Sequence, residues 1–212
     1  MRRVSVFQRV GTIVFDFLVI TVLLTLSLVL VFPFPFIVTG VHNYFLYKLD
    51  DRRLANIFNI IGENWKILLK FSLVWGIVLI LSVLEIVYFN SVWPGHNFLT
   101  LLCYVLLILC IILITNAPMI IIRMKVSLPQ LLFNCVTLIY GCWWFLLIAY
   151  IVTIGYCVAF SFYPYISGAG LYFLVLIDNL AARKAIRKLM AKAKKVPVSE
   201  IVEPENMDIT DK

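Results

Sequence analysis

The apolar residues of this 212-residue chain fall into long uninterrupted blocks, and the polar residues gather between them. Such blocks cover residues 11–32, 67–89 and 98–122, and a longer apolar tract runs from 131 to 177. An α-helix needs roughly 20 consecutive apolar residues to cross a lipid bilayer. The first three blocks have about this length, so each predicts one membrane-spanning helix.

The tract from 131 to 177 is too long for one span and contains its own break. Pro164 and the small residues up to Gly170 interrupt it, and such residues end or bend helices. We therefore expect two further spans, over residues 131–160 and 165–180.

The last predicted span continues into a basic helix over residues 181–195. Seven Lys and Arg residues lie between Arg183 and Lys195. The segment 196–212 is short and acidic, and this composition is typical of a disordered tail.

The segment between the first and second spans is irregular. Pro33 and Pro35 interrupt the helix, and the apolar piece that follows, residues 36–49, is shorter than a full span. Residues 50–66 then carry apolar side chains at helical spacing, with charged and amide side chains on the remaining faces. This pattern predicts an amphipathic helix that lies at the membrane interface.

The distribution of Lys and Arg predicts the topology, because basic residues near span ends mark the cytoplasmic side. The N-terminus, the stretch from Lys48 to Lys70 and the C-terminal tail are all basic. One crossing cannot join two cytoplasmic ends, so we expect the chain to return within residues 33–49. Whether this segment crosses or re-enters stays open, as does a single crossing with the N-terminus outside.

Composition agrees with a membrane protein. The chain is 63% hydrophobic and 14% charged, with a mean hydropathy of +1.03, and a soluble domain cannot cover so much apolar surface. The sequence thus predicts an all-α fold, a polytopic transmembrane helical bundle with five long spans plus one short returning or re-entrant helix. We expect a single transmembrane domain over residues 1–195.

The densest polar cluster at membrane depth is Thr39, Gly40, His42 and Asn43. We expect a turn here, into the returning segment, and non-helical backbone at that depth lines a cavity or is buried in protein. These residues are the candidate polar cavity or turn. His42 is read as structural, because no nucleophile or partner motif accompanies it.

Asn116 and Pro118, inside the third span, are candidates for helix packing or a kink. Asp16, Glu85 and Asp178 lie near span ends. Carboxylates at an interface are the favoured interpretation, ahead of a proton relay.

Catalytic and nucleotide-binding motifs are absent from the sequence, so we expect no enzyme and no cofactor. The cysteines lie in apolar segments without a nearby His or carboxylate, so we expect packing rather than a metal site. They are Cys103, Cys110, Cys135, Cys142 and Cys157. The basic tail adjoins a membrane helix, so attraction to anionic inner-leaflet lipid explains it better than nucleic-acid binding.

Several short motifs resemble the YesL family of small bacterial integral membrane proteins, which carry a domain of unknown function. They are Pro35–Gly40, Ile57-Phe58, Glu63–Lys66 and Lys125–Pro129. The resemblance implies a bacterial cell membrane location and an association with carbohydrate transport, often beside ABC-type sugar importers. It implies no catalytic residues.

Two functions follow as expectations. The first is a non-enzymatic accessory protein that assembles with, or regulates, a carbohydrate ABC importer. The alternative is a stand-alone carrier or channel for small solutes, because broken helices build transport sites in membrane proteins.

Overall fold

The computed structural model of the protein describes residues 6–47, 51–92, 97–162 and 167–194. These residues form helices and short connections and contain no strand, so the predicted all-α fold is confirmed for them. The predicted acidic tail at 196–212 lies outside the described residues.

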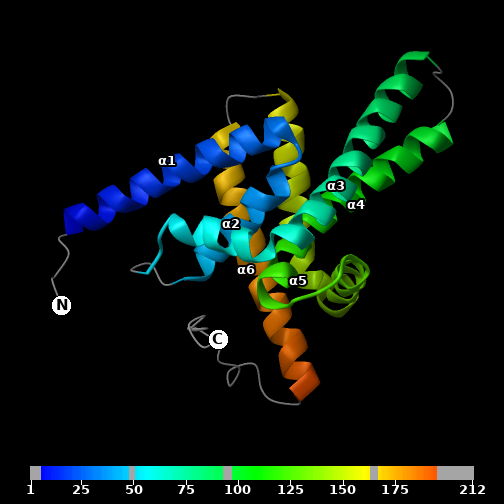
Figure 1. Ribbon diagram of the computed structural model, residues 1–212. Coiled ribbons are helices and arrows are strands. Elements are labelled where there is room, and N and C mark those ends of the chain that lie inside the picture. The colour runs from blue at the N-terminus through cyan, green and yellow to red at the C-terminus, as the bar shows by residue number, and fades with distance from the viewer. Residues whose placement is uncertain (1–5, 48–50, 93–96, 163–166, 195–212) are drawn as a thin grey trace.

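The helices follow the hydrophobic blocks of the sequence closely (Figure 1). They are α1 (Val6–Leu30), α2 (Phe34–Leu46), α3 (Ala55–Val92), α4 (Asn97–Arg123), α5 (Leu128–Phe162) and α6 (Ser167–Lys194). The predicted basic helix is the second half of α6.

Three of the helices are long and apolar enough to cross a membrane. These stretches are Val10–Leu30 in α1, Ala55–Tyr88 in α3 and Phe98–Arg123 in α4. Taken together, Leu128–Gly141 and Leu146–Tyr156 of α5 give a fourth, although they are bent by 104° relative to each other. Among the described residues the structure therefore supports three spans, or four with the bent pair, and the predicted number of five is not confirmed.

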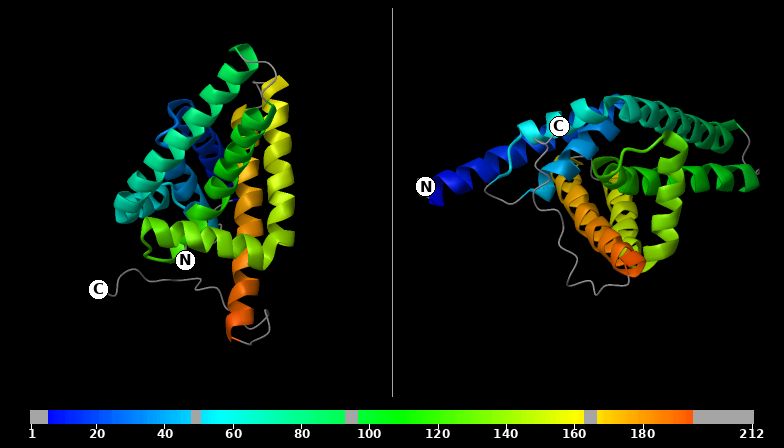
Figure 2. Two further views of the ribbon diagram at one scale, coloured as in Figure 1. Left: turned by 90° about the vertical axis from the view of Figure 1, so that its right-hand side faces the viewer. Right: turned by 60° about the horizontal axis from the view of Figure 1, so that its bottom comes forward.

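The helices spread outward from a common centre (Figures 1 and 2). α1 projects to one side, α3 and α4 form a long hairpin on the other, and the second half of α5 runs beside α6. The short helix α2 lies at the centre, where it contacts α1, α3, α4 and α6.

The predicted interfacial helix and the span after it form one element, α3. Its backbone departs from helical geometry at Asn64 (φ −112°, ψ 15°), whose side-chain amide donates to the Ile60 carbonyl at 3.2 Å. Ile57, Leu68 and Phe71 on either side of this kink are buried in the same core. The same face of α3 is buried before and after the kink. The predicted interfacial helix and the span after it therefore pack as one helix.

A tight connection turns the chain from α1 into α2. Val31 has φ 61°, a left-handed conformation that is strained for a β-branched residue. Pro33 and Pro35 stand at the start of α2, where a missing backbone N–H removes no helical hydrogen bond. The Ser72 hydroxyl of α3 donates a hydrogen bond to the Phe32 carbonyl of this connection. The break predicted at Pro33 is therefore where the chain reverses.

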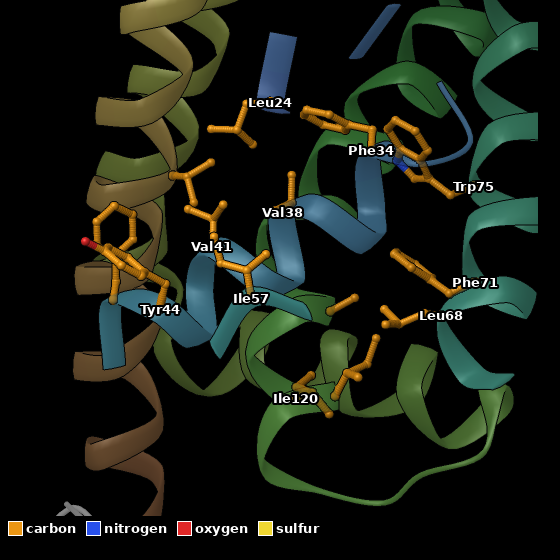
Figure 3. Close-up of a cluster of buried hydrophobic side chains, with 14 of the residues drawn as sticks. Leu24, Phe34, Val38, Val41, Tyr44, Ile57, Leu68, Phe71, Trp75 and Ile120 are labelled. Carbon is orange, nitrogen blue, oxygen red and sulfur yellow. The ribbon is translucent and has the colours of Figure 1, made fainter. Parts of the chain in front are cut away.

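Among the described helices, α2 is the most enclosed. Ten of its 13 residues are buried, and its apolar side chains form the core with α1, α3 and α4 (Figure 3). That core includes Leu24, Val38, Val41, Ile57, Phe71, Trp75 and Ile120. The turn predicted at Thr39–Asn43 is wrong, because these residues lie in the middle of this continuous helix.

Candidate functional site

Three of the four candidate residues of α2 contact their own helix or the adjacent helix α3. The Thr39 hydroxyl donates to the Pro35 carbonyl at 2.7 Å, within its own helix. The Asn43 amide donates to the Asn56 carbonyl at 3.0 Å, near the start of α3. A Cβ on Gly40 would lie 2.9 Å from the backbone oxygen of Ile57, so the glycine permits α2 and α3 to approach closely.

His42, the fourth candidate, reaches α6. The Asn179 amide nitrogen lies 3.2 Å from Nδ1 of His42 and donates to its backbone carbonyl at 3.0 Å. The same nitrogen lies 3.7 Å from the Met119 sulfur of α4. Because an amide N–H faces Nδ1, that ring nitrogen accepts and the ring proton belongs on Nε2.

Polar atoms remain unpartnered on both side chains. His42 and Asn179 are 0% and 1% exposed. Within the part of the chain that the structure describes, Nε2 of His42 and Oδ1 of Asn179 have no hydrogen-bond partner. Buried polar groups normally find partners, so unpartnered ones mark a site where a ligand or water binds.

Asn116 connects α4 to α5. Its amide nitrogen donates to the Tyr150 hydroxyl at 2.6 Å and to the Ile112 carbonyl at 2.9 Å. Its Oδ1 is a further buried atom without a partner among the described residues. α4 continues through Pro118 as far as Arg123. Asn116 thus makes a contact between helices and also carries an unused acceptor.

Asp178 lies deep between α5 and α6. It is 3% exposed, accepts a hydrogen bond from Thr153, and lies within electrostatic range of Tyr150. The packing of α5 against α6 buries this carboxylate, and its expected position near a membrane interface stays a prediction.

We define the polar cluster as His42, Asn116, Tyr150, Thr153, Asp178 and Asn179. Its members come from α2, α4, α5 and α6. Of these residues the sequence singled out His42 and Asn116 as site candidates. Tyr150, Thr153 and Asn179 lie in apolar stretches where nothing distinguishes them. The cluster can donate through an imidazole N–H and accept through amide and carboxylate oxygens.

The other acidic residues named from the sequence have separate partners. Asp16 of α1, 6% exposed, accepts a hydrogen bond from the Tyr44 hydroxyl at 2.7 Å. Glu85 of α3 accepts one from the Cys103 thiol of α4 at 3.1 Å.

His, Cys, Asp and Glu side chains do not gather in groups of three among the described residues. No group of three or more His, Cys, Asp or Glu in that part of the chain could hold a metal ion. Cys103, Cys110 and Cys135 are buried free thiols. The side chains of Cys142 and Cys157 lie outside the described residues.

Comparison of the chain with models of protein families, with curated proteins and with solved structures finds no match. The resemblance to the YesL family therefore stays an expectation drawn from short motifs. The polar cluster is the feature from which a function can be inferred.

Proposed function

We propose that this protein is a multi-pass integral membrane protein that acts as a carrier or channel for a small polar solute. The observation that carries the proposal is the fully buried pair His42 and Asn179, each of which has one polar atom without a partner among the described residues. Polar side chains inside a membrane bundle mark solute and ion pathways, and transporters use broken helices at their binding sites. His42 and Asn179, within the polar cluster, form the solute site in this proposal.

The pair favours a neutral solute that carries hydroxyl groups. Nε2–H of His42 can donate to a hydroxyl oxygen, and Oδ1 of Asn179 can accept that hydroxyl's proton. A hydroxyl group uses both functions at once, whereas a simple anion uses only the donor. This chemistry agrees with the association with carbohydrate transport that the resemblance implies.

The proposed orientation has both termini in the cytoplasm of a bacterial cell. Lys and Arg at the ends of α4 and α6 support it. Asn116 lies about 10 Å from Arg123 along α4 by helical rise, so the polar cluster lies nearer the cytoplasmic surface than the outer one. The basic second half of α6 then meets anionic lipid of the inner leaflet.

Solute flux tests the carrier proposal. The full chain is reconstituted in liposomes, and uptake of radiolabelled monosaccharides, disaccharides and polyols is compared with that of empty liposomes. We expect saturable uptake of at least one of them. The absence of uptake for every solute in the panel would contradict the proposal.

Variants of His42 then test whether the solute flux depends on the pair His42 and Asn179. His42→Phe keeps a planar ring but removes the N–H donor, and we expect at least a tenfold loss of uptake. His42→Gln keeps an N–H donor and should retain more uptake than His42→Phe. Asn59→Ala, an exposed amide on α3, is the matched control and should transport like the unaltered protein. Equal transport by all three variants would remove the pair from the site.

A second candidate is an accessory protein of a carbohydrate ABC importer. The motifs at Pro35–Gly40, Glu63–Lys66 and Lys125–Pro129 favour it through the family resemblance. Purification under mild detergent from the native membrane tests it. We expect importer subunits in near-stoichiometric amounts, and a preparation free of them would contradict this candidate.

A further inference from the structure

Asp178 is a buried carboxylate, and among the described residues no positive charge is found beside it. Thr153 donates a hydrogen bond to it, and Tyr150 lies within electrostatic range. Both groups are uncharged, so neither neutralises an ionised carboxylate that is only 3% exposed. Burying a charge in this way is costly unless a counter-charge accompanies it. Asp178 is therefore expected to take up a positive partner, either a proton or a metal cation.

A chain of contacts links this carboxylate of α6 to oxygen atoms of α4 and α5. Oδ1 of Asp178 and Oδ1 of Asn116 have no partner among the described residues. The Tyr150 hydroxyl accepts a hydrogen bond from the Asn116 amide at 2.6 Å and so links Asn116 to the Asp178 region. Thr153 adds a hydroxyl oxygen. α4, α5 and α6 thus supply carboxylate, amide and hydroxyl oxygens to one connected group of side chains.

We infer that Asp178, with Asn116, Tyr150 and Thr153, forms a binding site for a monovalent metal cation. Hard cations prefer oxygen ligands of these types. A single carboxylate balances a single positive charge, whereas divalent ions are commonly held by several carboxylates. A proton on Asp178 would also neutralise it, and a carboxylic-acid infrared band distinguishes the proton from the metal ion. A metal ion ligates several oxygens at once, and sodium is the probe ion.

The cation site adjoins the proposed solute site. Asp178 and Asn179 are consecutive residues of α6, and Asn116 lies one turn from Met119, which contacts Asn179. A cation at Asp178 is therefore positioned to affect a solute at His42 and Asn179. This coupling rests on the proposed function, whereas the binding of the cation does not.

Equilibrium binding of radioactive sodium to the full chain in lipid nanodiscs tests the inference. N-methylglucamine chloride holds the ionic strength constant. We expect saturable binding by the unaltered protein and at least tenfold weaker binding by Asp178→Asn, which keeps an acceptor for Thr153 but loses the charge. Thr153→Val, which removes one oxygen without changing the charge, should weaken binding by a smaller factor.

Asp16→Asn is the matched control. Asp16 is also a buried carboxylate, but Tyr44 hydrogen-bonds to it on α1 and α2. We expect its affinity for sodium to stay within twofold of the unaltered protein, and monodisperse elution verifies the folding of each variant.

Three results would overturn the inference. They are no saturable sodium binding, equal binding by Asp178→Asn and the unaltered protein, and a carboxylic-acid infrared band of Asp178 that persists in saturating sodium. Sodium binding without solute flux would remove the carrier proposal alone. Solute flux that ignores both sodium and Asp178→Asn would remove only the coupling between the two sites.

Discussion

The enclosed helix α2 and the α3–α4 hairpin have similarly apolar sequences but opposite surroundings. α2 buries ten of its 13 residues against four other helices. The hairpin leaves many apolar side chains exposed, such as Leu84 at 59% and Leu101 at 59%. Apolar residues therefore serve two purposes here. In α2 they fill a protein core, and in the hairpin they form a surface suited to lipid.

Substitution of Gly40 is expected to have the largest effect on the stability of the fold. In Gly40→Ala the new Cβ would collide with Cγ2 of Ile57 and lie 2.9 Å from its backbone oxygen. The backbone oxygen cannot move aside as a side chain can, so α2 and α3 must separate, at a cost of about 2–3 kcal/mol. Thermal stability in detergent measures the loss.

Gly62→Ala is the matched control, because a Cβ there meets nothing within 4 Å. Alanine at an exposed helical site is neutral or mildly stabilising. If both variants melted alike, close packing of α2 would not be the reason for Gly40.

A charge in the hairpin tests whether its apolar surface faces lipid. Leu109 lies mid-way along α4 and is 44% exposed. In lipid, Leu109→Lys should make the free energy of membrane insertion less favourable by about 3 kcal/mol. In water, such an exposed substitution would cost less than about 0.5 kcal/mol. Insertion measured in microsomes decides between the two, with Leu109→Ala as the uncharged control.

Removal of the Asn179 side chain should cost somewhat less. Asn179→Ala deletes the donor to Nδ1 and to the carbonyl of His42. Leaving those buried acceptors without it costs about 1–3 kcal/mol. Thermal unfolding of the variant beside Asn59→Ala checks this, and a loss no larger than that of the exposed control would contradict the contact.

The smallest effect is expected at Thr39. Its hydroxyl bonds only to the Pro35 carbonyl of its own helix, so Thr39→Val should cost about 1 kcal/mol or less. Solute uptake should be unchanged. A large loss of uptake would instead indicate that Thr39, like His42, belongs to the solute site.

The helices were predictable from the sequence, whereas their packing was not. Long apolar blocks, and breaks such as Pro33 and Pro164, are local signals that persist in any fold. The expected turn at Thr39–Asn43 failed because its Gly and Asn are also typical turn residues. Here Gly40 instead permits α3 to approach, and Asn43 hydrogen-bonds to its backbone.

Only some residues of the polar cluster could be identified from the sequence, because their partners lie far away along the chain. His42 and Asn116 drew attention because polar residues are rare in apolar segments. Their partners Asn179 and Tyr150 lie 137 and 34 residues away in sequence. The burial of Asp178 likewise depends on how α5 packs against α6, which no local pattern specifies.

The central position of α2 has a consequence for how the protein is made. α2 leaves the ribosome early, yet its His42 contacts Asn179, 137 residues further along the chain. During synthesis the polar side chains of α2 that contact α6 therefore lack these contacts until α6 has been inserted. Contacts between such distant residues form late. The helix at the centre of the finished protein is thus among the last to reach its final surroundings.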